Sequence, residues 1–204
     1  MYILYSDLES VFLPELWIEI AEQTGIEELK LTTRDISDLD VLTQKRIDVL
    51  RENKVDFKTI IEIIKKSEPL EGAVDFLRWA RETMPVIILS DTFWEFVSPI
   101  LNKIEHPTII CNSLEVDKDG FISGYTFREG GKKGTVEALQ QTGLRTIAIG
   151  DSYNDIGMLE KAEKAILFNA TEEMTQEFPQ FLAINNYGEL KSVLENIAKN
   201  KIEE

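Results

Sequence analysis

The spacing of apolar residues changes along the chain, and the change divides it into two parts. Residues 1–6 form a short apolar run of the kind found in buried strands. Over residues 15–66 apolar side chains recur at helical spacing, and no convincing strand interrupts them. The pattern therefore predicts one strand followed by a block of helices.

Beyond residue 66 strand and helix patterns alternate. Residues 67–72 include a proline and a glycine and mark a break. An amphipathic helix is predicted at residues 73–83, and period-two spacing around a turn predicts a β-hairpin at residues 114–127. Further strands are predicted at 86–89, 108–111, 146–149, 165–168 and 181–184, and further helices at 93–104, 135–141, 153–162 and 187–198.

This alternation predicts an α/β fold, a Rossmann-like parallel sheet with helices on both faces. The helical block interrupts the first strand–helix crossover, so we expect a small helical cap inserted after the first strand, over the active edge. The hairpin is expected to form an antiparallel flap. The predicted division is an α/β core of residues 1–14 and 70–204 and a cap of residues 15–69.

Composition and charge exclude several classes of protein. The chain has 204 residues, a net charge of −15 and no basic patch, so no nucleic-acid partner is expected. No apolar run approaches the roughly 18–20 residues of a membrane helix, and no basic segment opens the chain. A cytoplasmic protein without membrane contact is expected, and its oligomeric state is left open, a homodimer included.

The single cysteine and the single histidine limit the chemistry further. Cys111 has no partner for an intrachain disulfide and cannot by itself build a cysteine-based zinc site. One histidine, His106, argues against a histidine-rich metal site and against a Ser–His–Asp triad. Any metal site in this chain is therefore expected to use oxygen ligands.

Polar and acidic residues follow three of the predicted strands, and in an open parallel sheet such strand ends share one crevice. Two carboxylates about 4 Å apart repel by roughly 4 kcal/mol at an effective dielectric of 20, so a cluster of them needs a cation. Oxygen ligands alone favour Mg²⁺. Aspartate and asparagine after a strand can also simply cap the next helix. Acidic residues after three strands are more than helix capping requires. The residues are Asp7, Glu9, Ser90, Asp91, Asp151, Asn154 and Asp155.

Three motifs, Asp7-Leu8-Glu9, Ser90-Asp91-Thr92-Phe93 and the run from Gly150 to Asp155, resemble those of the haloacid dehalogenase-like phosphohydrolases. The resemblance covers nearly the whole chain and is to phosphoserine phosphatases with a small helical cap. Within these, the chain looks like a subgroup described as bifunctional phosphoserine phosphatase and homoserine phosphotransferase. The resemblance implies an Mg²⁺-dependent enzyme of serine biosynthesis with L-phosphoserine as substrate, an aspartyl-phosphate intermediate and homoserine as a second acceptor.

The resemblance assigns the central chemistry to three residues. Asp7 would be the nucleophile and a metal ligand, and Asp151 would complete the metal shell. Glu9 would act as general acid and base, with its main-chain carbonyl helping to ligate the metal. The family usually has aspartate where Glu9 stands, and glutamate adds roughly 1.5 Å of reach. Either the pocket is built for Glu9, or catalysis is crippled.

The same resemblance assigns supporting roles to four more residues. Ser90 would bind a phosphoryl oxygen, and Asn154 would contact the phosphoryl group or its water. Asp91 stands where the family commonly has glycine. A buried acid beside a phosphate is costly unless it points away or contacts the substrate ammonium, so Asp91 is expected either to point away or to read that ammonium. Asp155 would orient a lysine or a metal-bound water.

Lysine and the substrate-reading residues complete the expected site. Lys132 has the better spacing to Asp151, whereas Lys133 followed by glycine resembles the general family motif, so both are kept as substrate-binding candidates. Phosphoserine carries a carboxylate and an ammonium besides its phosphate, so recognition needs one cation and one anion. Glu15 and Arg46 match the positions at which phosphoserine phosphatases place such residues.

Three other interpretations remain. The chain could act on another small phosphomonoester, or it could be a degenerate binding protein disabled by Glu9. A non-catalytic receiver-like switch also collects acids around Mg²⁺, but a receiver is about half this length and has no cap. A nucleotide-binding Rossmann protein is disfavoured, because no Gly-x-Gly-x-x-Gly follows the first strand.

Overall fold

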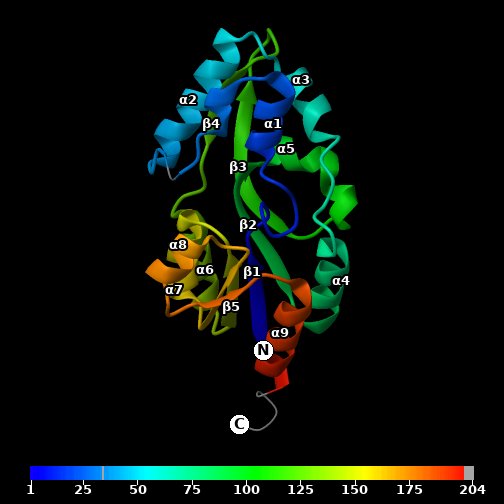
Figure 1. Cartoon of the computed structure of the whole chain (residues 1–204), viewed down its shortest axis with the longest axis vertical. Coiled ribbons are helices and arrows are strands. Elements are labelled where there is room, and N and C mark those ends of the chain that lie inside the picture. Colours follow the sequence, from blue (N-terminus) through cyan, green and yellow to red (C-terminus); the bar gives the residue numbers. More distant parts are fainter. Residues whose placement is uncertain (34, 200–204) are drawn as a thin grey trace.

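The computed structural model describes residues 1–33 and 35–199, and within them seven strands form one sheet in the order β4-β3-β2-β1-β5-β6-β7 (Figure 1). The central strand pairs in parallel with both of its neighbours, and the parallel pairing continues to β6 and β7. Residues 200–204 of the predicted core lie outside the described residues. The strands are β1 (Tyr2–Ser6), β2 (Val86–Phe93), β3 (Ile109–Val116), β4 (Ile122–Thr126), β5 (Arg145–Gly150), β6 (Lys164–Phe168) and β7 (Leu182–Ile184).

Both faces of the sheet are covered, which explains why β1 reads as an unbroken apolar run. Alternate side chains of a strand point to opposite faces, and Leu4 packs in one buried cluster while Ile3 and Tyr5 pack in the other. The predicted α/β class and the helices on both faces are confirmed. One face carries α4 (Ala73–Thr83), α5 (Trp94–Val97) and α9 (Tyr187–Lys199), and the other carries α6 (Gly131–Gln140), α7 (Ile156–Lys161) and α8 (Glu172–Glu177).

The block after β1 is helical, as predicted, and no strand occurs among its described residues. It comprises α1 (Leu16–Thr24), the 3₁₀ turn η1 (Glu27–Lys30), α2 (Leu39–Glu52) and α3 (Phe57–Ile64). Asp38 and Asp56 begin α2 and α3 by accepting hydrogen bonds from backbone N–H groups of the first turn. In Figure 1 the block lies with β4 at the upper end of the molecule.

The predicted hairpin is confirmed as the antiparallel pair β3–β4, and it is fastened to the helical block. The Tyr125 hydroxyl lies 3.0 Å from a carboxylate oxygen of Asp40 in α2. Arg51 pairs with Asp117 of the turn at 2.8 Å. The hairpin is therefore a brace between the sheet edge and the block.

Several element boundaries differ from the sequence prediction. The predicted strand at 108–111 and the first arm of the hairpin are one strand, β3, which pairs in parallel with β2 and then antiparallel with β4. β2 extends to Phe93, because pairing with β3 resumes there after a register shift beyond Leu89. The predicted helix at 93–104 is α5 followed by the 3₁₀ turn η2 (Ser98–Ile104), and η3 (Tyr153–Asp155) precedes α7.

Two helices were placed wrongly or missed. α6 begins at Gly131, four residues before the predicted start at residue 135, because Gly130 takes a left-handed conformation (φ 71°) and starts the helix there. α8 was not predicted; Thr171 caps it by accepting a hydrogen bond from the Met174 N–H. Over the described part of the chain, no helix is long and apolar enough to cross a membrane.

Candidate active site

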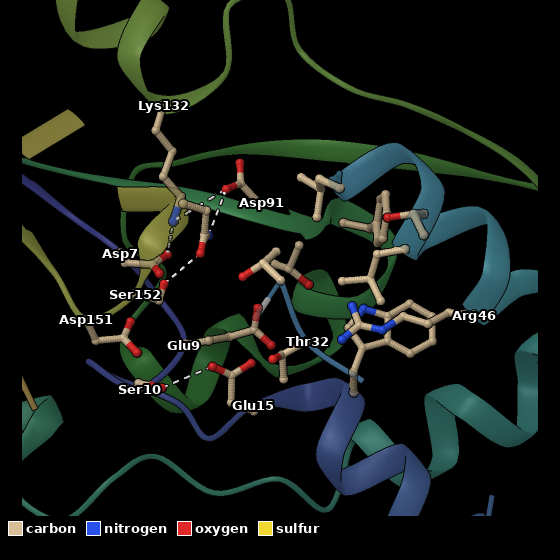
Figure 2. Close-up of a pocket in the computed structure, with 18 of the residues that line it drawn as sticks. Asp7, Glu9, Ser10, Glu15, Thr32, Arg46, Asp91, Lys132, Asp151 and Ser152 are labelled. Atoms are coloured by element: carbon tan, nitrogen blue, oxygen red, sulfur yellow. Dashed lines mark hydrogen bonds and ion pairs between the residues drawn. The ribbon is translucent and has the colours of Figure 1, made fainter. Parts of the chain in front are cut away.

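A pocket with a volume of about 330 Å³ lies between the carboxyl ends of the central strands and the helical block (Figure 2). Its strand-side surface, called the floor, is formed by Asp7, Asp91, Lys132 and Asp151. The opposite surface, called the roof, is formed by Glu15, Trp17, Thr32, Thr33, Leu39, Leu42, Thr43 and Arg46. The strand ends that the sequence analysis singled out therefore meet at one cavity, and the helical block closes it.

Asp7 directly follows β1 and is 5% exposed. Its Oδ1 accepts a hydrogen bond from the Leu8 N–H at 2.7 Å and lies 2.8 Å from Lys132 Nζ. Its other carboxylate oxygen accepts no hydrogen bond from any described residue. The pKa of Asp7 is raised to about 8, chiefly by burial and then by the Asp155 carboxylate, while Lys132 acts in the opposite direction. One oxygen is thus anchored and the other is available.

Lys132, in the first turn of α6, is a buried cation surrounded by carboxylates. Its Nζ lies 2.7 Å from Asp155 Oδ1, 2.8 Å from Asp7 Oδ1 and 3.7 Å from Asp91 Oδ2. Burial acts to lower the pKa of Lys132, but the Asp155 and Asp7 carboxylates outweigh it and hold the pKa well above its ordinary value. The lysine therefore stays charged and neutralises part of the floor.

The neighbouring lysine lies elsewhere. Lys133 is exposed and does not line the pocket. Its side chain packs beside Gly157 of α7, where an added Cβ would meet Lys133 Cβ at 3.3 Å. Of the two candidates, the structure brings only Lys132 to the floor, because the helix start at Gly130 turns successive side chains in different directions.

Asp155 lies beneath the floor and is fully buried. Its Oδ1 pairs with Lys132, and its Oδ2 accepts hydrogen bonds from the N–H groups of Asp151 and Ser152 and from the Ser152 hydroxyl. A Cβ at Gly150 would lie 2.4 Å from Asp155 Cβ, so only glycine allows this close approach. Both oxygens of Asp155 are therefore occupied in holding the lysine and the loop after β5.

Asp151 has the opposite environment. It lines the pocket and is 7% exposed, yet its carboxylate has no hydrogen bond or ion pair with any described residue. The pKa of Asp151 is raised to about 9, chiefly by burial and then by Asp155 and Asp7. Oxygens of these three aspartates lie within 4.8 Å of one another, so the buried cluster could hold a metal ion. Asp7 and Asp151 are the members with an available oxygen.

Glu9 reaches from the strand side toward the roof (Figure 2). Its Oε1 accepts a hydrogen bond from the Leu16 N–H, the first residue of α1, at 2.8 Å. The pKa of Glu9 is raised to about 8, chiefly by burial and then by Glu15. Its side chain is not part of the aspartate cluster. The longer arm that distinguishes glutamate from aspartate is used to contact the helical block.

Ser90 and Asn154 differ in access to the cavity. Ser90 is fully buried, does not line the pocket, and its hydroxyl accepts a hydrogen bond from the Thr92 N–H at 3.2 Å. Asn154 lines the pocket, and its side-chain oxygen accepts a hydrogen bond from the Ser152 hydroxyl at 2.7 Å. Asn154 is therefore the more accessible of the two candidate phosphoryl ligands.

Asp91 is held by protein groups on both of its oxygens. Its Oδ1 lies 3.0 Å from Arg128 Nη2, and its Oδ2 accepts a hydrogen bond from Asn154 Nδ2 at 3.1 Å. From the sequence we expected this carboxylate to point away or to meet a substrate ammonium, and nothing there indicated Arg128 as its partner. Nothing in the sequence marks this arginine as buried, because exposed arginines next to turns have the same local pattern.

The roof carries two opposite charges above the floor. Arg46 is 8% exposed, its guanidinium lies 4.8 Å above the Trp17 ring, and its Nη2 donates to the Leu31 carbonyl at 2.6 Å. Burial lowers the pKa of Arg46 to about 10, while Glu9 and Glu15 act against this. Glu15 is exposed and accepts a hydrogen bond from the Ser10 hydroxyl at 3.2 Å. Glu15 and Arg46 thus line the same cavity as Asp7.

Neutral roof residues were missed by sequence reasoning. Thr43 is 2% exposed, and Leu39 and Leu42 share its helix, α2. Thr32 and Thr33 come from the loop before α2. No signal in the sequence separates these residues from ordinary helix and loop positions, because only the docking of the block on the sheet turns them toward the cavity.

The chain is similar to known proteins in sequence and in fold. Two profiles, both described as haloacid dehalogenase-like hydrolase, match residues 18–160 and 132–196. The chain is 47% identical over 186 residues to the phosphoserine phosphatase ThrH of Pseudomonas aeruginosa, covering 91% of each chain. It is 45% identical to a phosphoserine phosphatase of Pseudomonas syringae pv. tomato, over 91% of this chain and 78% of that one. A crystal structure of a phosphoserine phosphatase in apo form matches with a TM-score of 0.72 at 25% identity, covering 95% of this chain and 97% of that chain.

Proposed function

Because the chain belongs to the haloacid dehalogenase-like hydrolases, we propose that it is an enzyme that hydrolyses L-phosphoserine through an aspartyl-phosphate on Asp7. The observation that carries the proposal is the composition of the cavity between the strand ends and the helical block. Asp7 and Lys132 lie on its floor, and Glu15 and Arg46 lie in its roof. A substrate with a phosphate at one end and a carboxylate and an ammonium at the other fits this distribution of charge.

In the first step an oxygen of Asp7 attacks phosphorus in line, and the bond from phosphorus to the serine oxygen breaks. Lys132 Nζ lies 2.8 Å from Asp7 Oδ1 and acts against the raised pKa of Asp7, and a Mg²⁺ ion at the site would act in the same direction, so that the carboxylate would be ionised with its other oxygen left to react. Glu9, with a pKa near 8, is protonated at neutral pH and donates its proton to the departing serine oxygen.

In the second step water attacks the aspartyl-phosphate, and Glu9 takes the proton that the water releases. Inorganic phosphate leaves, and Asp7 and the protonated Glu9 are restored. Asn154 contacts the phosphoryl group from the side of β5, and Ser90 contributes its hydroxyl or neighbouring amides from β2. Asp155 keeps Lys132 in place.

The site fits Mg²⁺. A buried carboxylate without a partner is costly, and Asp151, beside Asp7, has none among the residues that the structure describes. Carboxylate oxygens are hard donors, and we assign the ion to Asp7, Asp151 and the main-chain carbonyl of Glu9. When bound, the ion neutralises negative charge on the phosphoryl oxygens and on the two aspartates.

The roof selects the substrate. In this proposal residues 15–69 act as a helical cap, Arg46 binds the substrate carboxylate and Glu15 binds its ammonium. Arg46 is suited to this role, because stacking on Trp17 and the bond to Leu31 hold the guanidinium in place. Its Nε is buried without a hydrogen-bond partner among the described residues.

Phosphate release from L-phosphoserine with Mg²⁺, measured with and without homoserine, tests the proposal. The family resemblance leads us to expect homoserine to serve as a second acceptor, so O-phosphohomoserine is assayed in the same tubes. Phosphate release in both arms supports the phosphatase, and appearance of phosphohomoserine supports the transferase as well. Absence of both products, with hydrolysis of a generic aryl phosphate retained, would move the assignment to another phosphomonoester.

A further inference from the structure

Arg128 is a buried cation that the proposed reaction does not use. It lies in the connection between β4 and α6, and its side chain is 12% exposed. Its Nη2 lies 3.0 Å from Asp91 Oδ1, and its Nη1 donates to the Ser90 carbonyl. One guanidinium therefore holds the side chain of one residue and the backbone of the residue before it.

The same segment is tied to the sheet by an asparagine. Asn112 in β3 is 5% exposed, and its Oδ1 accepts a hydrogen bond from the Arg128 N–H at 3.0 Å. Its Nδ2 donates to the Asp91 carbonyl at 2.8 Å. These bonds hold the irregular stretch of β2 between Leu89 and Phe93, where regular pairing with β3 is interrupted.

Charge explains why the position of Lys132 depends on this arrangement. Lys132 Nζ faces three carboxylates and lies 2.7–2.8 Å from Asp155 and Asp7 but 3.7 Å from Asp91. Coulomb attraction increases as the separation falls, so an unpaired Asp91 would draw the ammonium toward itself. Arg128 offsets the charge of Asp91 from its other side and leaves Lys132 with Asp7.

We propose that Arg128 and Asp91 are a pair of positioning residues, which keeps Lys132 on the nucleophile and Ser90 in place. In this arrangement Asp91 serves the protein and not the substrate ammonium, because each of its oxygens is held by a side chain, Oδ1 by Arg128 and Oδ2 by Asn154. The expected fall in kcat rests on the proposed function, whereas the expected displacement of Lys132 does not.

The variants that test the pair are Arg128→Gln, Asp91→Asn and the double variant. In Arg128→Gln the Asp91 carboxylate loses its cation, and Lys132 is expected to move from Asp7 toward it. A displacement near 1 Å costs about 100-fold in rate, so kcat should fall roughly 10- to 100-fold on both L-phosphoserine and an aryl phosphate, with little change in KM. Arg78→Gln, which breaks a surface pair with Asp75 and Glu105, is the matched control.

The double variant separates positioning from simple loss of contacts. Removing Asp91 together with Arg128 removes the charge that attracts Lys132, so kcat should recover by roughly 10-fold relative to Arg128→Gln alone. The proposal would be overturned if the loss of kcat in the double variant equalled the combined losses of the two single variants. A rise in KM confined to L-phosphoserine in Asp91→Asn would also overturn it, because that result would assign Asp91 to the substrate ammonium.

Crystal structures of the variants supply a readout that needs no substrate. The distance from Lys132 Nζ to position 91 should shorten in Arg128→Gln and lengthen again in the double variant; an unmoved Lys132 in Arg128→Gln would overturn the pair. If the wild type hydrolyses neither ester, the proposed function fails while this measurement still tests the pair. If Arg128→Gln does not fold, Arg128→Lys takes its place in the test. This variant keeps the positive charge, so it should fold, hold Lys132 in place and lose less kcat.

Discussion

On the floor of the pocket Asp7 and Lys132 are no more than 5% exposed, and each is held by charged or backbone groups of other elements. In the roof Glu15 is exposed and has one side-chain hydrogen bond, at 3.2 Å. Buried charges must be paired almost completely, so a change on the floor disturbs several groups at once. An exposed charge can be exchanged at little cost. Arg46 in the roof is 8% exposed and is held by the Trp17 ring and the Leu31 carbonyl, so it resembles the floor in this respect. The floor is therefore suited to fixed chemistry, and Glu15 is the roof charge that can vary.

Removing the nucleophile should have the largest effect. Asp7→Asn keeps an oxygen that can accept from Leu8 and Lys132 but cannot form the aspartyl-phosphate, so kcat should fall roughly 10⁴-fold or more on every phosphate ester. Steady-state hydrolysis of L-phosphoserine and of an aryl phosphate measures it, with circular dichroism as the control for folding. Residual turnover within 10-fold of the wild type would contradict Asp7 as nucleophile.

Glu9 connects floor and roof, and two substitutions separate its functions. Glu9→Gln removes the proton donor and should lower kcat about 10²- to 10⁴-fold while keeping an acceptor for the Leu16 N–H. Glu9→Asp keeps the acid but shortens the arm by roughly 1.5 Å, so it should lose that hydrogen bond and about 100-fold in rate. The pH dependence of kcat for the three proteins is the measurement. Full activity in Glu9→Asp would show that the pocket does not need the longer arm.

Changes in the roof should be smaller and selective. Arg46→Gln and Glu15→Gln each remove one charged contact with the substrate, worth about 1.5–3 kcal/mol, or roughly 10- to 150-fold in kcat/KM for L-phosphoserine. Hydrolysis of an aryl phosphate, which has neither carboxylate nor ammonium, should change far less. Equal losses on both esters would contradict the difference between floor and roof. Lys45→Gln, on the same helix as Arg46 but exposed and outside the pocket, is the control.

The mildest expected effect is on stability and its dependence on pH. In a chelator the folded chain keeps protons on Asp151 and Asp7 at pH values where the unfolded chain has lost them, because their pKa values rise from 3.8 to about 9 and 8. The free energy of unfolding should therefore decrease as the pH rises between about 4 and 9. Urea unfolding at pH 5, 7 and 9 measures this free energy of unfolding.

Mg²⁺ and one substitution sharpen this test. Added Mg²⁺ should stabilise the protein more at pH 9 than at pH 5, because it competes with protons for the same oxygens. Asp151→Asn should flatten the fall in stability. Asp117→Asn should not, because the pKa of Asp117 is lowered by the Phe121 N–H and Arg51, so its contribution is lost only in acid. If the free energy of unfolding of the metal-free wild type does not change with pH, the raised pKa values of Asp7 and Asp151 are contradicted.

Much of the floor could be predicted from the sequence, because local patterns determine it. Apolar runs define β1 and β5, and whatever directly follows them must appear at the carboxyl edge of the sheet. Asp7 and Asp151 are placed in this way. The glycine before Asp151 and the acid four residues after it also belong to one local turn, in which Asp155 accepts from the loop it follows.

Other features depended on the backbone conformation at one glycine or on contacts between distant parts of the chain. Whether Lys132 or Lys133 reaches the floor depended on the residue at which α6 begins, and that start is set by the backbone conformation of Gly130. The orientation of Glu9 toward Leu16 required the helical block to be docked. Residue spacing predicts neither feature, because the sequence is the same whichever lysine reaches the floor and whichever way the Glu9 side chain points.

By itself the sequence determined the α/β class, the order of most of the elements and the acidic residues at the strand ends, because hydrophobic periodicity and the position of a residue after a strand are local properties. Only the tertiary structure decided that Arg128 pairs with Asp91, that Asp151 has no partner within residues 1–33 and 35–199, and which neutral residues form the roof. These are properties of charges and surfaces brought together from far apart in the chain, and their energies depend on burial and distance, which spacing along a sequence does not encode.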